Sequence, residues 1–199
     1  MESTPAAYAD AFRRAYDEAA ALAGGLTAEQ FNWKPAPDVW SVAECLVHLN
    51  RANAPYPEAM ERALEGAPKG TPPFRYGPVA RWFIASVGPR PKRKVKTIPK
   101  MAPAPATDYA ADRVLADFRA LTDDFLRIIA RAEREGLDLA RVRIGSPFVP
   151  LLRLPVGAFL EALAGHEQRH LDQARRVTER PEFPRQSGPG SASPTTSNR

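Results

Sequence analysis

The chain has 199 residues, 44% of them hydrophobic, and its 28 Lys and Arg against 23 Asp and Glu give a formal net charge of +5. It is long enough to bury one substantial core, and so small a charge excess argues against the global basic field of a nucleic-acid-binding protein. The single cysteine, Cys45, excludes an intrachain disulfide, no apolar run approaches the roughly 20 residues of a membrane span, and the N-terminus lacks the apolar core of a signal peptide. We therefore expect a soluble protein of the cytoplasm that binds neither nucleic acid nor membrane.

Two helices are predicted in the first third of the chain. Apolar side chains recur every three or four residues over about residues 5–23, and two glycines follow directly. The second helix covers about residues 41–66, where Ser41 and Glu44 have the spacing of a capping box. Two prolines near its middle should kink or split it.

Two more long helices are predicted further on, over about residues 107–135 and 155–179, and no segment reads convincingly as a strand. A long crossover joins the second and third helices. It begins with a short helix over residues 77–88 and continues as a basic, proline-punctuated segment to about residue 105. Four amphipathic helices with a long crossover favour an all-α fold, a four-helix bundle.

We expect one helical domain over residues 1–183 and a disordered tail over residues 184–199, because the tail lacks apolar periodicity. Six basic side chains gather within residues 88–100. They either attract an acidic substrate or belong to a solvated loop, and they lack the interleaved aromatics of a nucleic-acid site. The apolar stretch ARWFIASVG (80–88) could pair two copies of the chain in a homodimer.

The chain has three histidines, and two of them, His166 and His170, lie four residues apart on the last predicted helix. That spacing places both imidazoles on one helix face, where they can share a metal ion. The face is the apolar one that includes Phe159 and Leu163, whereas Glu167 and the neighbouring charged residues are expected on the other faces. Two inward imidazoles without partners would be costly, and a shared metal would remove that cost.

The third histidine, His48, lies beside the apolar stripe of the second helix. Taken alone, it could be a partly buried residue that is hydrogen-bonded to a carbonyl group or to Glu44. Since all three histidines of the chain face inward, a joint role is the sharper hypothesis.

Two segments resemble a known family. The segment FNWKPAPDVWSVAECLVHL (31–49) resembles DinB/YfiT-like proteins, in which a loop rich in Pro and Trp leads to a Trp-Ser pair and a helix with a histidine. The segment HEQRHLDQ (166–173) is similar to the closing helix of that family, an HxxxH pair followed by Gln. The resemblance extends over about residues 5–180, although the crossover over residues 77–105 departs from the minimal bundle.

This resemblance implies a four-helix bundle of the DinB/YfiT type in which His48, His166 and His170 bind one divalent metal, zinc or nickel. Relatives include S-transferases that use bacillithiol or mycothiol, a maleylpyruvate isomerase and the metal domain of sulfoxide synthases. The implied function is a metal-dependent enzyme that acts on small molecules, either a transferase with a low-molecular-weight thiol or a hydrolase. The alternative is a non-catalytic protein of the same fold whose metal site is structural or vestigial.

Three imidazoles leave a tetrahedral ion with one open position. Cys45, one turn before His48, is either a fourth ligand, a nucleophile or a small buried apolar residue. Glu44 and Gln173 are candidates for orienting the ligands from the second shell, and the capping box offers another role for Glu44. Trp33 and Trp40 line a pocket or belong to the core.

Overall fold

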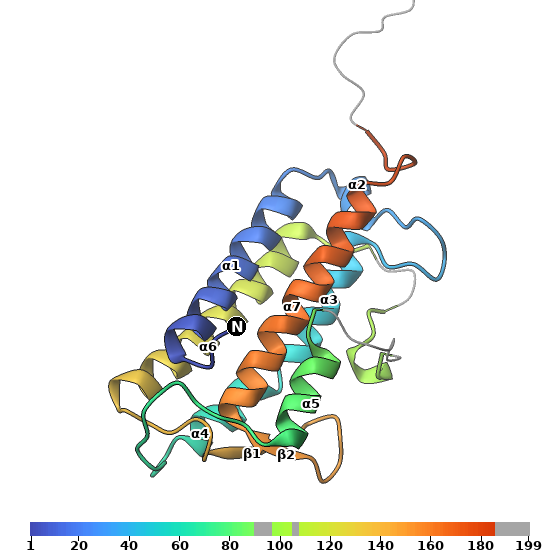
Figure 1. Cartoon of the computed structure of the whole chain (residues 1–199). Coiled ribbons are helices and arrows are strands. Elements are labelled where there is room, and N and C mark those ends of the chain that lie inside the picture. Colours follow the sequence, from blue (N-terminus) through green and yellow to red (C-terminus); the bar gives the residue numbers. More distant parts are fainter. Residues whose placement is uncertain (90–96, 105–107, 186–199) are drawn as a thin grey trace, which may run out of the picture.

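A computed structural model of the chain describes residues 1–89, 97–104 and 108–185 (Figure 1). Most of the basic stretch within residues 88–100 and most of the tail over residues 184–199 lie outside the described residues. The expectations for these two segments therefore stay predictions.

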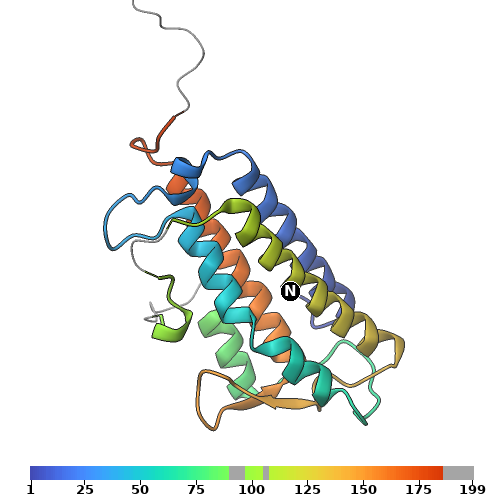
Figure 2. The same cartoon turned by 180° about the vertical axis from the view of Figure 1, so that it is seen from behind.

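The described fold is mostly helical, and four helices lie side by side (Figures 1 and 2). Helices α1 and α3 each pack against both α6 and α7, which closes a ring of four. The four are α1 (Pro5–Gly24), α3 (Val42–Asn53), α6 (Ala111–Arg134) and α7 (Val156–Thr178). All four correspond to predicted helices, so the prediction of a mostly helical fold is confirmed.

Smaller elements cover the edges and one end of this arrangement. Helix α5 packs on α7, and the 3-10 helix η1 contacts α3 (Figure 1). These elements are α2 (Ala28–Asn32), α4 (Tyr56–Ala63), α5 (Pro78–Val87) and η1 (Pro99–Met101). The predicted break in the second helix is the boundary between α3 and α4, and the predicted short helix is α5. Helix α2 was not predicted.

Local sequence explains where two of the long helices begin. The predicted capping box at the start of α3 is present, since Ser41 accepts from the backbone of Glu44 and Glu44 accepts from the backbone of Ser41. Helix α6 begins at Ala111, later than predicted. The reason is that the amide of Asn32 binds both the N–H (2.8 Å) and the carbonyl (2.9 Å) of Tyr109, which holds this residue outside the helix.

The expectation that the chain contains no strand was wrong. Strands β1 (Arg143–Gly145) and β2 (Arg153–Pro155) form a two-stranded antiparallel sheet in which Ile144 pairs with Leu154. Three-residue strands are too short to show an alternating pattern, and only Ile144, Leu154 and Pro155 are buried. Pro155 therefore ends β2 and precedes the first turn of α7.

Two hydrophobic clusters fill the interior. One cluster contains the start of α1, the second half of α6 and the first half of α7, up to Ala164. The other contains the end of α1, most of α3 and α7 from Leu171 onward. Along α7 the boundary between the two clusters coincides with His166 and His170, so polar side chains separate two apolar layers.

None of the described helices is long and apolar enough to cross a membrane.

Gly157 provides a test of the packing at the start of α7. A Cβ atom there would lie 2.2 Å from the hydroxyl of Tyr76, which shares a 2.5 Å hydrogen bond with the hydroxyl of Tyr8. We predict that Gly157→Ala lowers the free energy of unfolding by about 1–3 kcal/mol, since the extra methyl group overpacks the site. Denaturant titration measures this change.

Gly24→Ala is the matched control, because a Cβ atom at Gly24, the last residue of α1, has nothing within 4 Å. It should leave stability unchanged or raise it by up to about 1 kcal/mol. Equal effects of the two substitutions would contradict the packing described for Gly157.

Candidate metal centre

Three histidines from two helices meet between α3 and α7. One ring nitrogen from each of His48, His166 and His170 lies within 4.8 Å of the others. The three ring centroids are 4.5–5.0 Å apart. Because His166 and His170 are one helical turn apart, α7 presents them together, and α3 presents His48 from the facing side.

The orientation of His48 is fixed by a backbone group of the crossover. Its Nδ1 lies 3.0 Å from the carbonyl oxygen of Met101. A carbonyl can only accept, so Nδ1 of His48 donates and carries the proton. The Nε2 of the neutral ring is then left with its lone pair, and it faces Nε2 of His166 at 3.3 Å.

Trp40 forms an aromatic wall of the cluster. Its ring lies 4.9 Å from that of His48 and stacks on that of His170 at 5.7 Å, measured between centroids. The residue that opens the family-like Trp-Ser pair is therefore in contact with two of the three histidines. Trp33 lies elsewhere and packs edge-on against Phe183 at 5.5 Å.

All three imidazoles are held neutral. Burial lowers the pKa of His48, of His166 to about 3 and of His170 to about 2, and the neighbouring histidines lower the last two further. The guanidinium of Arg169 adds a smaller effect of the same sign on each ring. Neutral imidazole is the form that binds metal ions.

The donor set fits a divalent cation. Two nitrogens bound to one tetrahedral zinc ion at about 2.0–2.1 Å lie about 3.3–3.4 Å apart, and the two Nε2 atoms of His48 and His166 are 3.3 Å apart. Nδ1 of His170 is buried and has no hydrogen-bond partner among the described residues. Three neutral rings that crowd together in this way match a site that a cation would complete.

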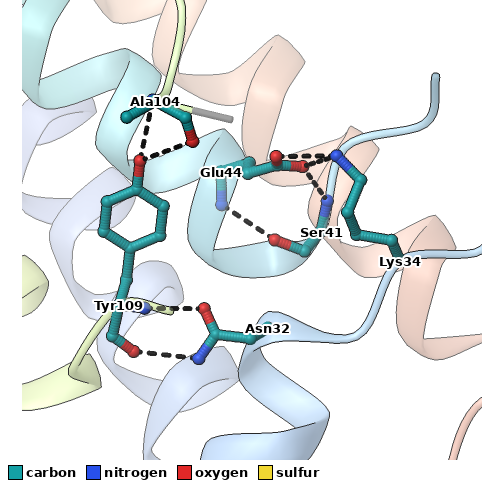
Figure 3. Close-up of polar contacts among 6 residues, drawn as sticks. All are labelled: Asn32, Lys34, Ser41, Glu44, Ala104 and Tyr109. Carbon is teal, nitrogen blue, oxygen red and sulfur yellow. Dashed lines mark hydrogen bonds and ion pairs between the residues drawn. The ribbon is translucent and has the colours of Figure 1, made fainter. Parts of the chain in front are cut away.

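Glu44 is engaged away from the histidines. Both of its carboxylate oxygens lie 2.7 Å from Nζ of Lys34, and one also accepts from the backbone of Ser41 at 3.0 Å (Figure 3). These bonds account for the carboxylate as a helix cap and an ion-pair partner. The hydrogen bond that orients His48 comes instead from Met101.

Gln173 and Cys45 stand in different relations to the site. Gln173 lies beside His170 and opposes the lowering of its pKa, but Nδ1 of His170 remains without a hydrogen bond. Cys45 is fully buried within an apolar cluster and is not among the residues whose ligand atoms meet. Burial raises the pKa of its thiol, which keeps it protonated.

The expectation that Glu167 lies on a polar face of α7 was wrong, because this residue is only 1% exposed. Its Oε1 accepts a 2.7 Å hydrogen bond from Nδ2 of Asn53, and burial raises its pKa well above the usual range. Helix α7 packs against α1, α3 and α5, so its buried arc is wider than a single stripe. The burial of Asn53 was also not predicted, although this residue continues the inward stripe of Leu46 and Leu49.

The fold and the cluster together define a helical protein with three largely buried histidines in an arrangement compatible with a metal site. The sequence model of the DinB superfamily matches residues 11–174, which include all three histidines, and the chain belongs to this superfamily. No curated protein and no solved structure matches the chain. The resemblance in the two histidine-bearing segments is thus confirmed at the level of the family.

The lowered histidine pKa values predict how the metal-free protein responds to acid. The unfolded chain takes up protons near pH 6.5, whereas His166 and His170 in the fold resist protonation down to about pH 3 and 2. Stability should therefore fall as the pH drops below about 6.5, by about 1.4 kcal/mol per pH unit for each neutral histidine. Urea titrations of chelator-treated protein between pH 7.5 and 4.5 measure the slope.

The double variant His166→Gln/His170→Gln is the reference, because it removes both groups and keeps polar side chains. As the pH falls, the free energy of unfolding of the wild type should decrease more steeply than that of the variant. A difference that is constant over this range would contradict the neutral, buried state of the two rings.

Proposed function

We propose that this chain is a metal-dependent member of the DinB superfamily in which His48, His166 and His170 hold one divalent cation, zinc or nickel. The ring of four helices would then be a four-helix bundle of the DinB/YfiT type. The observation that supports the proposal best is the meeting of three neutral imidazoles, with two Nε2 atoms 3.3 Å apart.

The number of protein ligands favours a catalytic metal site over a closed structural one. Structural zinc sites use four protein ligands, whereas catalytic sites use three and keep one open position. Among the described residues, neither Cys45 nor a carboxylate joins the three histidines. When bound, a divalent cation supplies Lewis acidity, which lowers the pKa of a water or thiol ligand. The reaction classes that this favours are thiol S-transfer and hydrolysis of small molecules.

Arg169 supports a substrate with an anionic group. This residue lies on α7 between the two histidines of the HxxxH pair, and its charge acts on all three rings. No carboxylate lies within 4.0 Å of its guanidinium among the described residues, although burial lowers its pKa. A partly buried guanidinium without a counter-ion is suited to bind a carboxylate or a thiolate.

The metal proposal predicts one equivalent of zinc or nickel per chain in wild-type protein. His166→Ala and His170→Ala should each retain less than about a tenth of that metal, because two imidazoles bind far more weakly than three. Elemental analysis after gel filtration measures the content. Cys45→Ala is the control and should bind as much metal as wild type.

Two outcomes would contradict this reading. Equal metal content in wild type and in both histidine variants would remove the histidine site. Loss of metal in a folded Cys45→Ala variant would indicate a closed site of three histidines and a cysteine, and the non-catalytic alternative would then be favoured.

The role of Arg169 predicts a preference between two small thiols. Cobalt-loaded wild type should bind mercaptoacetate more tightly than 2-mercaptoethanol, and Arg169→Gln should weaken mercaptoacetate binding by about 10-fold, since a charge-assisted hydrogen bond contributes about 1.5–3 kcal/mol. Titration of the cobalt absorption bands measures both affinities. Arg176→Gln, at an exposed position of the same helix, is the control. Equal mercaptoacetate affinity in the two variants would exclude Arg169 from ligand binding.

A further inference from the structure

The last described part of the crossover contacts the histidine cluster through His48. Residues 97–104 include η1, which contacts α3. The views from the two sides agree that this segment runs beside α3, next to the face where α3 meets α7 (Figures 1 and 2). Residues 97–104 are called the strap below.

The strap contributes a backbone acceptor to a candidate metal ligand. The carbonyl of Met101 accepts from Nδ1 of His48 at 3.0 Å, and the carbonyl of the next residue, Ala102, accepts from the guanidinium of Arg51. His48 and Arg51 are three residues apart on α3, so one helix face holds two successive carbonyls of the strap. The prolines at positions 99 and 103 have no N–H and restrict the backbone of the strap.

The far end of the strap is tied down by a second set of bonds. The hydroxyl of Tyr109 accepts from the N–H of Ala104 at 2.8 Å and donates to the carbonyl of Ala104 at 3.3 Å (Figure 3). Tyr109 is itself held at its backbone by the side-chain amide of Asn32 on α2. Three side chains, those of His48, Arg51 and Tyr109, thus bind a segment that has no sheet or long helix of its own. Asn32 acts indirectly, because it holds Tyr109.

We propose that the strap is the outer layer of the metal centre and that Arg51 and Tyr109 are positioning residues for His48. The carbonyl of Met101 selects the tautomer of His48 with its proton on Nδ1. That choice directs the Nε2 lone pair toward His166 and His170. Without it the ring can rotate or exchange tautomers, and one of the three donors is no longer in place. The effect of the strap on metal affinity rests on the proposed metal function. The effect of the strap on the tautomer of His48 does not.

The test compares two double variants that lose the same chemical groups. Arg51→Ala/Tyr109→Phe removes both side-chain anchors of the strap. Arg119→Ala/Tyr16→Phe is the control, because it also removes one guanidinium and one hydroxyl. These two residues form a cation–π pair between α6 and α1, with Cζ of Arg119 5.8 Å from the ring centroid of Tyr16. Both proteins are first checked for folding by circular dichroism. If the first double variant does not fold, Tyr109→Phe alone replaces it, because it keeps the ring and loses only the hydroxyl.

Two readouts separate this inference from the metal function. In the metal-free protein, long-range nitrogen–proton NMR spectra of the histidines should show His48 in the Nδ1–H tautomer in wild type and control. The strap variant should show a mixture. In competition with a chelator, zinc affinity should fall about 10- to 100-fold in the strap variant and stay unchanged in the control.

The outcomes are distinct. A wild-type His48 with its proton on Nε2, or a folded strap variant with wild-type zinc affinity, overturns the positioning role. If wild type binds no metal but shows the Nδ1–H tautomer, which the strap variant loses, the proposed metal function fails and the orientation by Met101 stands.

Discussion

Three imidazoles are crowded together in the interior, between α3 and α7, and the groups around them hold this arrangement in place. Each ring loses water on folding, and an unpaired polar group in such a place costs on the order of 1–3 kcal/mol. One of the rings, His170, has a buried Nδ1 that finds no hydrogen-bond partner in the part of the chain that the structure describes. The fold gains no stability from an unpaired ring nitrogen, so packing alone does not account for the arrangement.

The apolar layers on both sides give the crowded rings their order. Helix α7 belongs to one hydrophobic cluster up to Ala164 and to the other from Leu171, which fixes its register across the polar layer. Trp40 covers two of the rings, and the buried pair of Asn53 and Glu167 joins α3 to α7 next to them. The protein itself therefore holds the rings in place, which is the preorganisation that a metal site needs.

The crossover between the two halves of the fold also helps to hold the imidazoles in place. A carbonyl group 53 positions after His48 in the chain satisfies its outer nitrogen. A long connection of this kind is costly in entropy, and in this protein part of it contributes to the site rather than only linking helices.

Sequence reasoning identified the four long helices and the three histidines because both depend on local periodicity. His166 and His170 continue a visible apolar stripe, and the Ser41–Glu44 spacing is a cap that local rules describe. The contact of Met101 could not be found in this way, since a backbone carbonyl has no signature in the residue type. Glu167 was misplaced because burial on α7 depends on how many helices surround it, which is a tertiary property.

X-ray absorption spectroscopy of the zinc-loaded protein identifies the atoms bound to the ion and therefore tests whether the three histidines form one metal centre. We expect three imidazole nitrogens and one further light atom, at about 2.0–2.1 Å, with no sulfur at about 2.3 Å. A sulfur ligand would bring Cys45 into the site and close it. Fewer than three imidazoles would contradict the assignment of His48, His166 and His170 as one metal centre.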